Sequence, residues 1–263
     1  KDSTTALVSQ FAFNDKSGFV LDTTHMKFLM SDKIISAQEL YFKTPRSLLQ
    51  NFFELKFDSA ADISRRPQNS LISAKLNGTT IAFNDLYMLL PSMAKPFPKA
   101  QFANQYLALN TELRGTLQRM YLPYLELRGL SGSRISARGT LYNIADPLRL
   151  SYDLFIINSS ILKKDIFRFV PPANQKMFAS LPSLINLRGS IKGTKNDLAG
   201  NINLSGKDLA FAGKINLTNI SDPAKMKYGF DFKSATLSRD FIAGFLPPAI
   251  LKQVNLPSSF TAV

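Results

Sequence analysis

The chain has 263 residues, 45% of them hydrophobic, so it can bury a substantial core. It has no cysteine, which excludes disulfides, thiolate metal sites and cysteine nucleophiles. Its 32 Lys and Arg residues outnumber its 19 Asp and Glu residues, and the formal charge of +13 favours anionic partners such as phospholipid head groups, lipopolysaccharide or nucleic acid. The basic residues are dispersed along the chain and form no recognised binding motif, which argues against nucleic acid.

The two ends of the chain predict a piece of a longer protein. It begins in polar sequence at Lys1 without an initiator methionine or a signal peptide, and it stops at Val263 inside a predicted strand, 259–263. No run of about 18 apolar residues is present that would cross a bilayer as a helix. We therefore expect any anchor or export signal to lie outside this sequence.

Two-residue alternation of apolar and polar side chains dominates the chain and predicts strands with one apolar face. Between Lys225 and Lys233, for example, apolar even positions alternate with mostly charged odd positions. Turns rich in Gly, Asn and Asp separate such segments, as at 194–197, and predict a mostly antiparallel meander. The candidate residues for a shared apolar face, in chain order, are Phe53, Leu55, Phe57, Leu107, Leu109, Leu113, Leu148, Leu150, Tyr152, Leu154, Ile202, Leu204, Ile215, Leu217, Met226, Tyr228, Phe230 and Phe232.

A long unit recurs along the chain: a glycine-led strand, an Asp-Pro turn, an alternating strand, then Asp followed by an apolar stretch that ends in proline. Gly139 and Gly213 open two copies and lie 74 residues apart, while Asp165 and Asp240 lie 75 apart. A partial copy begins at Asp85, 80 residues before Asp165. Repeats of this length predict one elongated array.

We divide this array into three repeat segments. The first covers residues 1–80, the second 81–160, and the third 161–263 with the start of the next repeat. The turns of the two full copies fall at Asp146-Pro147 and Asp222-Pro223, and alternating strands are predicted directly after them, at 148–156 and 224–232.

The apolar stretches led by Asp85, Asp165 and Asp240 predict short helices. In 160–170, apolar residues have helical spacing, and Pro171-Pro172 would end the segment. We expect the three aspartates to be N-caps, whose carboxylates accept hydrogen bonds from the first helical turn. Lys163, Lys164 and Arg168 make 160–170 a small basic amphipathic element; covering a sheet end is favoured over contact with an anionic membrane.

Little in the chain points to catalysis. The only histidine, His25, excludes a site with two histidine ligands, and we expect an exposed histidine on a strand. The acids occur singly on polar strand faces, which does not favour paired-carboxylate chemistry. We predict a protein that is not an enzyme, with no catalytic residues, metal or cofactor.

Three phrases in the sequence are more specific than alternation. Residues 11–21 have a strand, Ser-Gly-Phe, strand pattern, Leu40–Ser47 reads L-x-x-x-T-x-x-S, and residues 184–198 form a glycine-spaced strand. These phrases resemble the repeat of the AsmA-like superfamily, and most closely the repeat region of TamB-type translocation and assembly proteins. The likeness extends over essentially the whole chain.

The resemblance implies a U-shaped trough, or β-taco, with an apolar concave face. It implies a periplasmic location within a parent protein anchored in the inner membrane, and a barrel partner in the outer membrane. The expected function is a conduit that carries phospholipid between the two membranes, with the candidate residues above contacting acyl chains. Membrane contact would be indirect or made by other parts of the parent protein.

Three alternatives stay open. Alternation alone would also fit a closed β-sandwich, in which the apolar stripe packs on a second sheet. An open sheet edge could instead serve as a strand template for barrel assembly or protein translocation. The chain could also be a structural or adhesive β-array, in which the stripe is only core.

Overall fold

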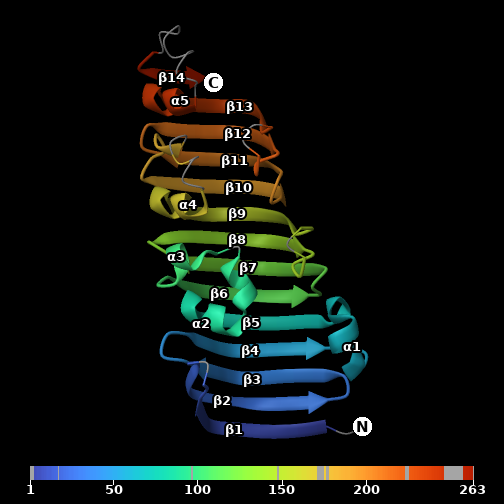
Figure 1. Cartoon of the computed structure of the whole chain (residues 1–263). Coiled ribbons are helices and arrows are strands. Elements are labelled where there is room, and N and C mark those ends of the chain that lie inside the picture. Colours follow the sequence, from blue (N-terminus) through green and yellow to red (C-terminus); the bar gives the residue numbers. More distant parts are fainter. Residues whose placement is uncertain are drawn as a thin grey trace. The chain divides into compact units, whose positions relative to one another are not determined.

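A computed structural model describes residues 3–16, 18–95, 97–146, 148–170, 175, 178–222, 225–245 and 257–262 (Figure 1). In these residues, hydrogen bonds join fourteen strands in chain order, from β1 to β14, into one sheet that does not close on itself. The neighbouring strands within each unit described below pair in antiparallel fashion. The predicted all-β class with a few short helices is therefore confirmed.

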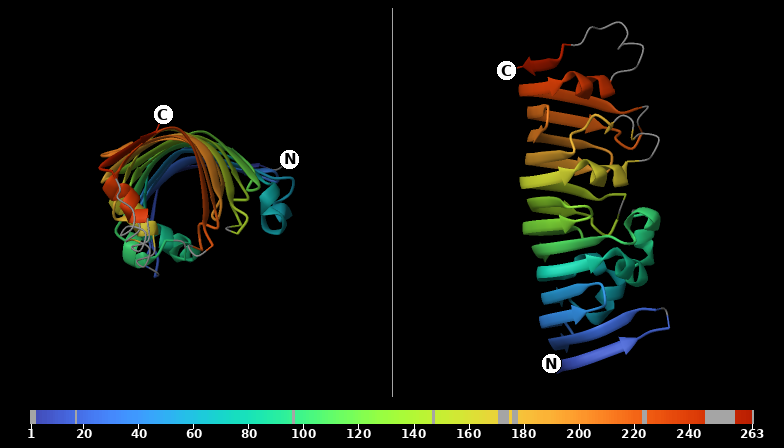
Figure 2. Two further views of the ribbon diagram at one scale, coloured as in Figure 1. Left: turned by 90° about the horizontal axis from the view of Figure 1, so that it is seen from above. Right: turned by 90° about the vertical axis from the view of Figure 1, so that its left-hand side faces the viewer.

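The chain forms two compact units. The N-terminal unit comprises Lys1–Leu130 and Arg138–Ser151, and the C-terminal unit comprises Ser131–Ala137 and Tyr152–Val263. The predicted repeat segments, 1–80, 81–160 and 161–263, are a different division and stay a prediction. The strands within each unit are curved, so that each presents a concave face (Figure 2).

The N-terminal unit contains seven complete strands among the described residues, with helices in two of their connections. The elements are β1 (Ser3–Asn14), β2 (Val20–Ser31), β3 (Ile34–Lys43), β4 (Leu48–Lys56), α1 (Ala60–Arg65), η1 (Pro67–Asn69), β5 (Leu71–Ala82), α2 (Phe83–Leu89), η2 (Pro91–Ala94), α3 (Lys99–Phe102), β6 (Tyr106–Gly115) and β7 (Arg119–Gly129).

Strand β8 is shared between the two units, and the remaining elements lie in the C-terminal unit apart from the first residue of β9. They are β8 (Ser133–Tyr142), β9 (Ser151–Leu162), α4 (Lys163–Phe169), β10 (Leu184–Thr194), β11 (Leu198–Gly206), β12 (Leu209–Thr218), β13 (Lys227–Ser238), α5 (Arg239–Phe245) and β14 (Ser259–Ala262). The predicted strand at 259–263 is confirmed up to Ala262, and Val263 lies outside the described residues.

A short helix follows every fourth strand: α2 follows β5, α4 follows β9 and α5 follows β13. These helices contain the three aspartates that led the predicted apolar stretches. The repeat seen in the sequence is therefore a module of four strands and a helix. The prolines of the two predicted Asp-Pro turns, Pro147 and Pro223, lie outside the described residues, as do Pro171 and Pro172.

Glycines on the apolar face allow adjacent strands to approach closely. Gly189 of β10 has a φ of 134°, a backbone conformation that is unfavourable for residues with a side chain. A Cβ atom there would lie 2.2 Å from the carbonyl oxygen of Asn201 on β11 and 2.7 Å from the Cα of Ile202. The backbone of β11 thus occupies the space that a side chain would need.

A compact apolar cluster lies under the helices that follow β5. Phe83, Tyr87 and Phe102 are almost completely buried, and their rings meet at centroid distances of 5.2 to 6.2 Å. The Tyr87 hydroxyl donates a hydrogen bond of 2.7 Å to the carbonyl of Phe97. Burial of side chains of this size stabilises a structure by about 1.5 to 3 kcal/mol each, so the cluster fastens α2 and α3 to the unit.

Candidate apolar groove

Register across β10–β13 brings the apolar residues of the C-terminal unit onto one face of the sheet. Ile215 lies between Gly200 and Phe230, and Leu217 lies between Leu198 and Tyr228. Because side chains alternate along a strand, every second residue joins the same face. We call this face the C-terminal groove, and its predicted members are Ile202, Leu204, Ile215, Leu217, Tyr228, Phe230 and Phe232.

The aromatic side of the C-terminal groove is open to solvent. Tyr228 is 68% exposed, Phe230 50% and Phe232 46%. The rings of Phe230 and Phe232 stack at 5.9 Å, and Phe211 meets Phe232 edge to face at 5.5 Å. A second sheet over this face would have buried these rings, so a closed β-sandwich does not describe the unit.

The N-terminal unit has an equivalent apolar face. Phe53 of β4 pairs with Ala74 of β5, which pairs with Leu113 of β6. Leu55 lies two residues along on β4, and Leu107 and Leu109 share the face of Leu113 on β6. We call this face the N-terminal groove, and its predicted members are Phe53, Leu55, Leu107, Leu109 and Leu113.

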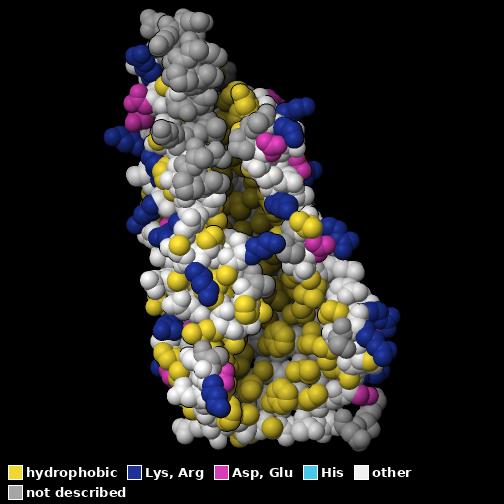
Figure 3. Space-filling model, in the orientation of Figure 1, with side chains coloured by type: hydrophobic (Ala, Val, Ile, Leu, Met, Phe, Trp, Pro, Cys, Tyr) yellow, Lys and Arg dark blue, Asp and Glu magenta, His cyan; other side chains and the backbone are white. Residues whose placement is uncertain are grey.

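In the space-filling view, the hollowed face of the N-terminal unit is lined by hydrophobic side chains (Figure 3, lower half). Hydrophobic side chains are also visible in the hollow over the C-terminal unit. Lys and Arg side chains lie along the borders of each hollow. Within each unit, therefore, the concave face is the apolar one.

Four candidate residues do not line a strand as predicted. Leu148 and Leu150 precede β9, because the backbone N–H of Leu150 bonds to the carbonyl of Asp146 at 2.8 Å and winds this segment into a turn. Met226 likewise precedes β13. Phe57 follows β4 and is only 7% exposed, so it packs at the end of the strand and does not line an open groove.

The remaining two candidates, Tyr152 and Leu154, lie on β9 and alternate there with exposed Asp153. Burial raises the pKa of the Tyr152 phenol above its ordinary value. Sequence reasoning missed Leu187, Ile191 and Leu198, which join the C-terminal groove through the same register. The two-residue alternation of β10 could have identified Leu187 and Ile191, but Gly189 stands between them at a position where an apolar side chain was expected.

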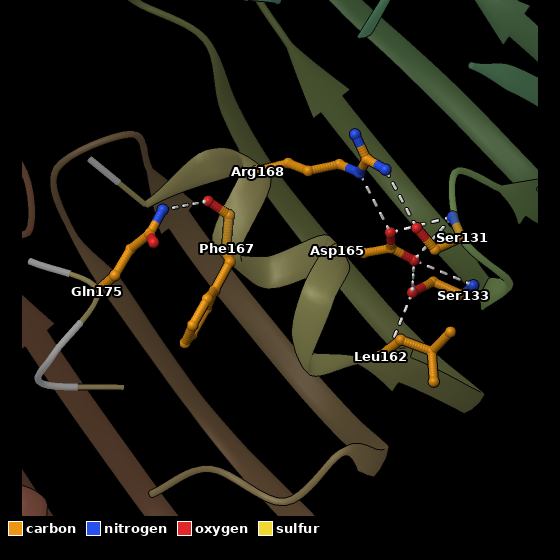
Figure 4. Close-up of polar contacts among 7 residues, drawn as sticks. All are labelled: Ser131, Ser133, Leu162, Asp165, Phe167, Arg168 and Gln175. Carbon is orange, nitrogen blue, oxygen red and sulfur yellow. Dashed lines mark hydrogen bonds and ion pairs between the residues drawn. The ribbon is translucent and has the colours of Figure 1, made fainter. Parts of the chain in front are cut away.

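Asp165 is not an N-cap, because α4 begins at Lys163 and its N-cap residue, Leu162, is the last residue of β9. The helix therefore begins three residues before the position that an N-cap at Asp165 would give it. The buried Asp165 carboxylate instead accepts hydrogen bonds from the Ser133 hydroxyl at 2.6 Å and from the backbone N–H of Ser131 at 3.0 Å (Figure 4). Arg168 forms an ion pair with it at 3.4 Å.

The Asp165 contacts fix α4 to the turn between β7 and β8. The Ser133 hydroxyl oxygen also accepts the backbone N–H of Leu162 at 2.9 Å, so one side chain holds both the carboxylate and the start of the helix (Figure 4). Burial alone raises the pKa of Asp165, but the hydrogen bonds from Ser133 and Ser131 outweigh it and hold that pKa below 3.8.

Asp85 has the same arrangement in the N-terminal unit and is likewise not an N-cap. Helix α2 begins at Phe83, and the buried Asp85 carboxylate accepts the Thr44 hydroxyl at 2.5 Å and the Ser47 hydroxyl at 2.6 Å. Arg46 lies 3.7 Å away in the same turn. The Thr and Ser of the L-x-x-x-T-x-x-S phrase therefore hold the helix that follows β5.

Asp240 is the second residue of α5 and is also not an N-cap. The residue before the helix, Ser238, takes that role, because its hydroxyl oxygen accepts the backbone N–H of Phe241 at 3.2 Å. All three N-cap predictions are wrong for one reason: each helix continues directly from a strand, and the aspartate falls inside its first turn.

The opposite face of the C-terminal unit is polar. A cavity of about 650 Å³ lies between β9 and β13, and its lining includes the polar residues Asp153, Lys192, Asn201, Lys214 and Asp231 together with Ile191, Ile215 and Phe230. Register places the polar β10–β13 side chains opposite to those of the C-terminal groove. The Lys214–Asp231 ion pair is 3.5 Å long and about 70% exposed, so it contributes little to stability.

His25 is exposed on β2, as predicted, and stacks on Tyr41 with 5.0 Å between ring centroids. The described residues contain no group of three or more His, Asp or Glu that could hold a metal ion. None of the described helices has the length and hydropathy needed to cross a bilayer.

Comparisons with protein-family models, with curated proteins and with solved structures find no match to this chain. The resemblance to TamB-type proteins therefore stays a hypothesis based on the phrases quoted above.

Proposed function

We propose that this chain is a non-enzymatic conduit that carries the acyl chains of phospholipids along its apolar concave faces. The observation that supports the proposal most strongly is the exposure of Phe230 and Phe232, which form an aromatic stripe on a single-layered sheet. A stripe of this kind is costly to leave in water, and acyl chains would cover it.

Burial of methylene groups can hold an acyl chain in a groove without a specific binding site. Each methylene that leaves water contributes about 0.8 kcal/mol, so ten methylenes contribute roughly 8 kcal/mol before the cost of ordering the chain. The predicted members of the N-terminal and C-terminal grooves carry no charge, so these residues offer no charged anchor that would halt a sliding chain. Such a surface suits transport better than storage of one defined ligand.

The setting that we propose follows the resemblance: the periplasm, within a parent protein anchored in the inner membrane, with transfer towards an outer-membrane barrel partner. The concave apolar face agrees with the β-taco that the resemblance implies. A strand-template role in barrel assembly stays an alternative prediction.

Transfer of a fluorescent phospholipid from donor to acceptor vesicles tests the proposal. We expect the chain to accelerate transfer, and Phe230→Asp to slow it, because the new carboxylate interrupts the C-terminal groove. Lys233→Asp introduces the same group on the polar side of the same strand. This variant should transfer phospholipid at the rate of the unmodified chain. Equal rates for the two variants would contradict the conduit.

A further inference from the structure

The α2–α3 segment (residues 83–95 and 97–102) has one buried side and one exposed apolar side. Phe83, Tyr87 and Phe102 pack inward. The last turn of α2 and the residue after it point a hydrophobic group into solvent, because Met88 is 42% exposed, Leu89 56% and Leu90 52%. Three large apolar residues in succession at a surface mark a contact site.

The exposed charged side chains of this segment are basic. Its only acid, Asp85, is 4% exposed, and its carboxylate accepts hydrogen bonds from Thr44 and Ser47 and pairs with Arg46. The two lysines, Lys95 and Lys99, are exposed, and the Lys99 ammonium lies 5.5 Å from the centroid of the Tyr87 ring. The exposed surface of this segment therefore carries both apolar groups and positive charge, and Figure 3 shows hydrophobic and basic side chains together over α2 and α3.

We propose that the α2–α3 segment docks on the surface of an anionic phospholipid bilayer. Met88, Leu89 and Leu90 would enter the interface between head groups and acyl chains, while Lys95 and Lys99 bind the phosphates. The two exposed lysines of this segment favour this occupant, since an apolar protein partner would gain nothing from them. The inference does not rest on the proposed conduit, and it departs from the expectation that membrane contact is indirect or made by other parts of the parent protein.

Helix α4 in the C-terminal unit has a related composition. Its acid, Asp165, is 2% exposed and is held by Ser131 and Ser133. Lys164 is exposed, and Phe169 at the end of the helix is 57% exposed. A buried aspartate thus removes negative charge from the surface of both helices, which leaves each with a basic and apolar exterior.

Flotation of the purified chain with closed vesicles tests the docking. We expect binding to vesicles of phosphatidylcholine mixed with phosphatidylglycerol, and little binding to phosphatidylcholine alone. Lys95→Gln with Lys99→Gln should weaken binding roughly 25-fold, at about fivefold per lysine. Leu89→Ser with Leu90→Ser should weaken it at least about tenfold. All four residues are exposed or partly exposed, so folding should persist, and circular dichroism would check it.

The matched control is Lys43→Gln with Lys75→Gln, which removes the same charge from strands β3 and β5 of the same unit. This control should retain most of the binding. An equal loss in the control, or equal binding to neutral vesicles, would overturn the proposal. Phe230→Gln with Phe232→Gln, which leaves the net charge unaltered, should leave docking unchanged; a loss there would assign vesicle contact to the C-terminal groove and also overturn the proposal.

Discussion

The Asp165 carboxylate and the Ser133 hydroxyl lie 2.6 Å apart, and this contact joins α4 to the start of β8. Substitution of Asp165 by Ala would leave the Ser133 hydroxyl and the backbone N–H of Ser131 without their acceptor in a buried place. We expect a loss of about 3 kcal/mol in the free energy of unfolding, measured by urea denaturation.

Asp153→Ala on β9 is the control for this prediction, because Asp153 is exposed. Its effect should stay within about 0.5 kcal/mol. Similar small losses for both variants would show that the Asp165 contacts contribute little to stability.

The same carboxylate predicts a pH dependence. The pKa of Asp165 in the folded protein lies below its ordinary value of 3.8. The ionised carboxylate therefore contributes fully to the free energy of unfolding above pH 3.8, and this contribution is lost as the pH falls through the folded pKa. The difference in unfolding free energy between the unmodified chain and Asp165→Asn should therefore be constant from pH 7 to about pH 5 and shrink below about pH 4. Urea titrations at several pH values measure it, and a difference that stays constant down to pH 3 would refute this account.

Gly189 provides a test of the close approach between β10 and β11. Gly189→Ala places a Cβ atom 2.2 Å from a backbone oxygen, at a φ of 134°, so we expect destabilisation of more than about 2 kcal/mol. Gly229→Ala is the matched control, since the nearest atom to its Cβ is 3.9 Å away. Thermal unfolding of both variants separates the two cases, and equal melting temperatures would show that the strands can adjust.

The cluster beneath α2 predicts a large effect for Phe102→Ala. The Phe102 ring is fully buried, and its removal should cost about 3 to 5 kcal/mol. Leu89→Ala on the exposed side of α2 should cost less than about 0.5 kcal/mol. In Phe102→Ala, amide hydrogen exchange should become faster in residues 83–102. Exchange that stays slow there would show that the cluster is not what holds α2 and α3 on the unit.

The sequence predicted strands well where alternation was strict, as for Phe230 and Phe232, because a period of two has one structural meaning in an antiparallel sheet. It failed at Leu148 and Met226, where alternation continues into turns closed by backbone hydrogen bonds that no side-chain pattern records. The polar contacts of Asp85 and Asp165 were not predictable either. Their partners, Ser47 and Ser133, lie more than 30 residues away in the chain.

The open face was also beyond sequence reasoning. The residues of the C-terminal groove would show the same alternation if they packed on a second sheet, as in a closed sandwich. Only the curvature and the exposed rings distinguish the two, and both are properties of the folded sheet.

Mass spectrometry of lipids released from the chain after purification without detergent tests whether the grooves hold phospholipid. We expect stoichiometric phospholipid in the unmodified chain and in Lys227→Asp with Lys233→Asp, which alters the polar side of β13. We expect strongly reduced phospholipid in Phe230→Asp with Phe232→Asp. Absence of lipid from the folded unmodified chain, or equal lipid in both variants, would contradict the proposed conduit.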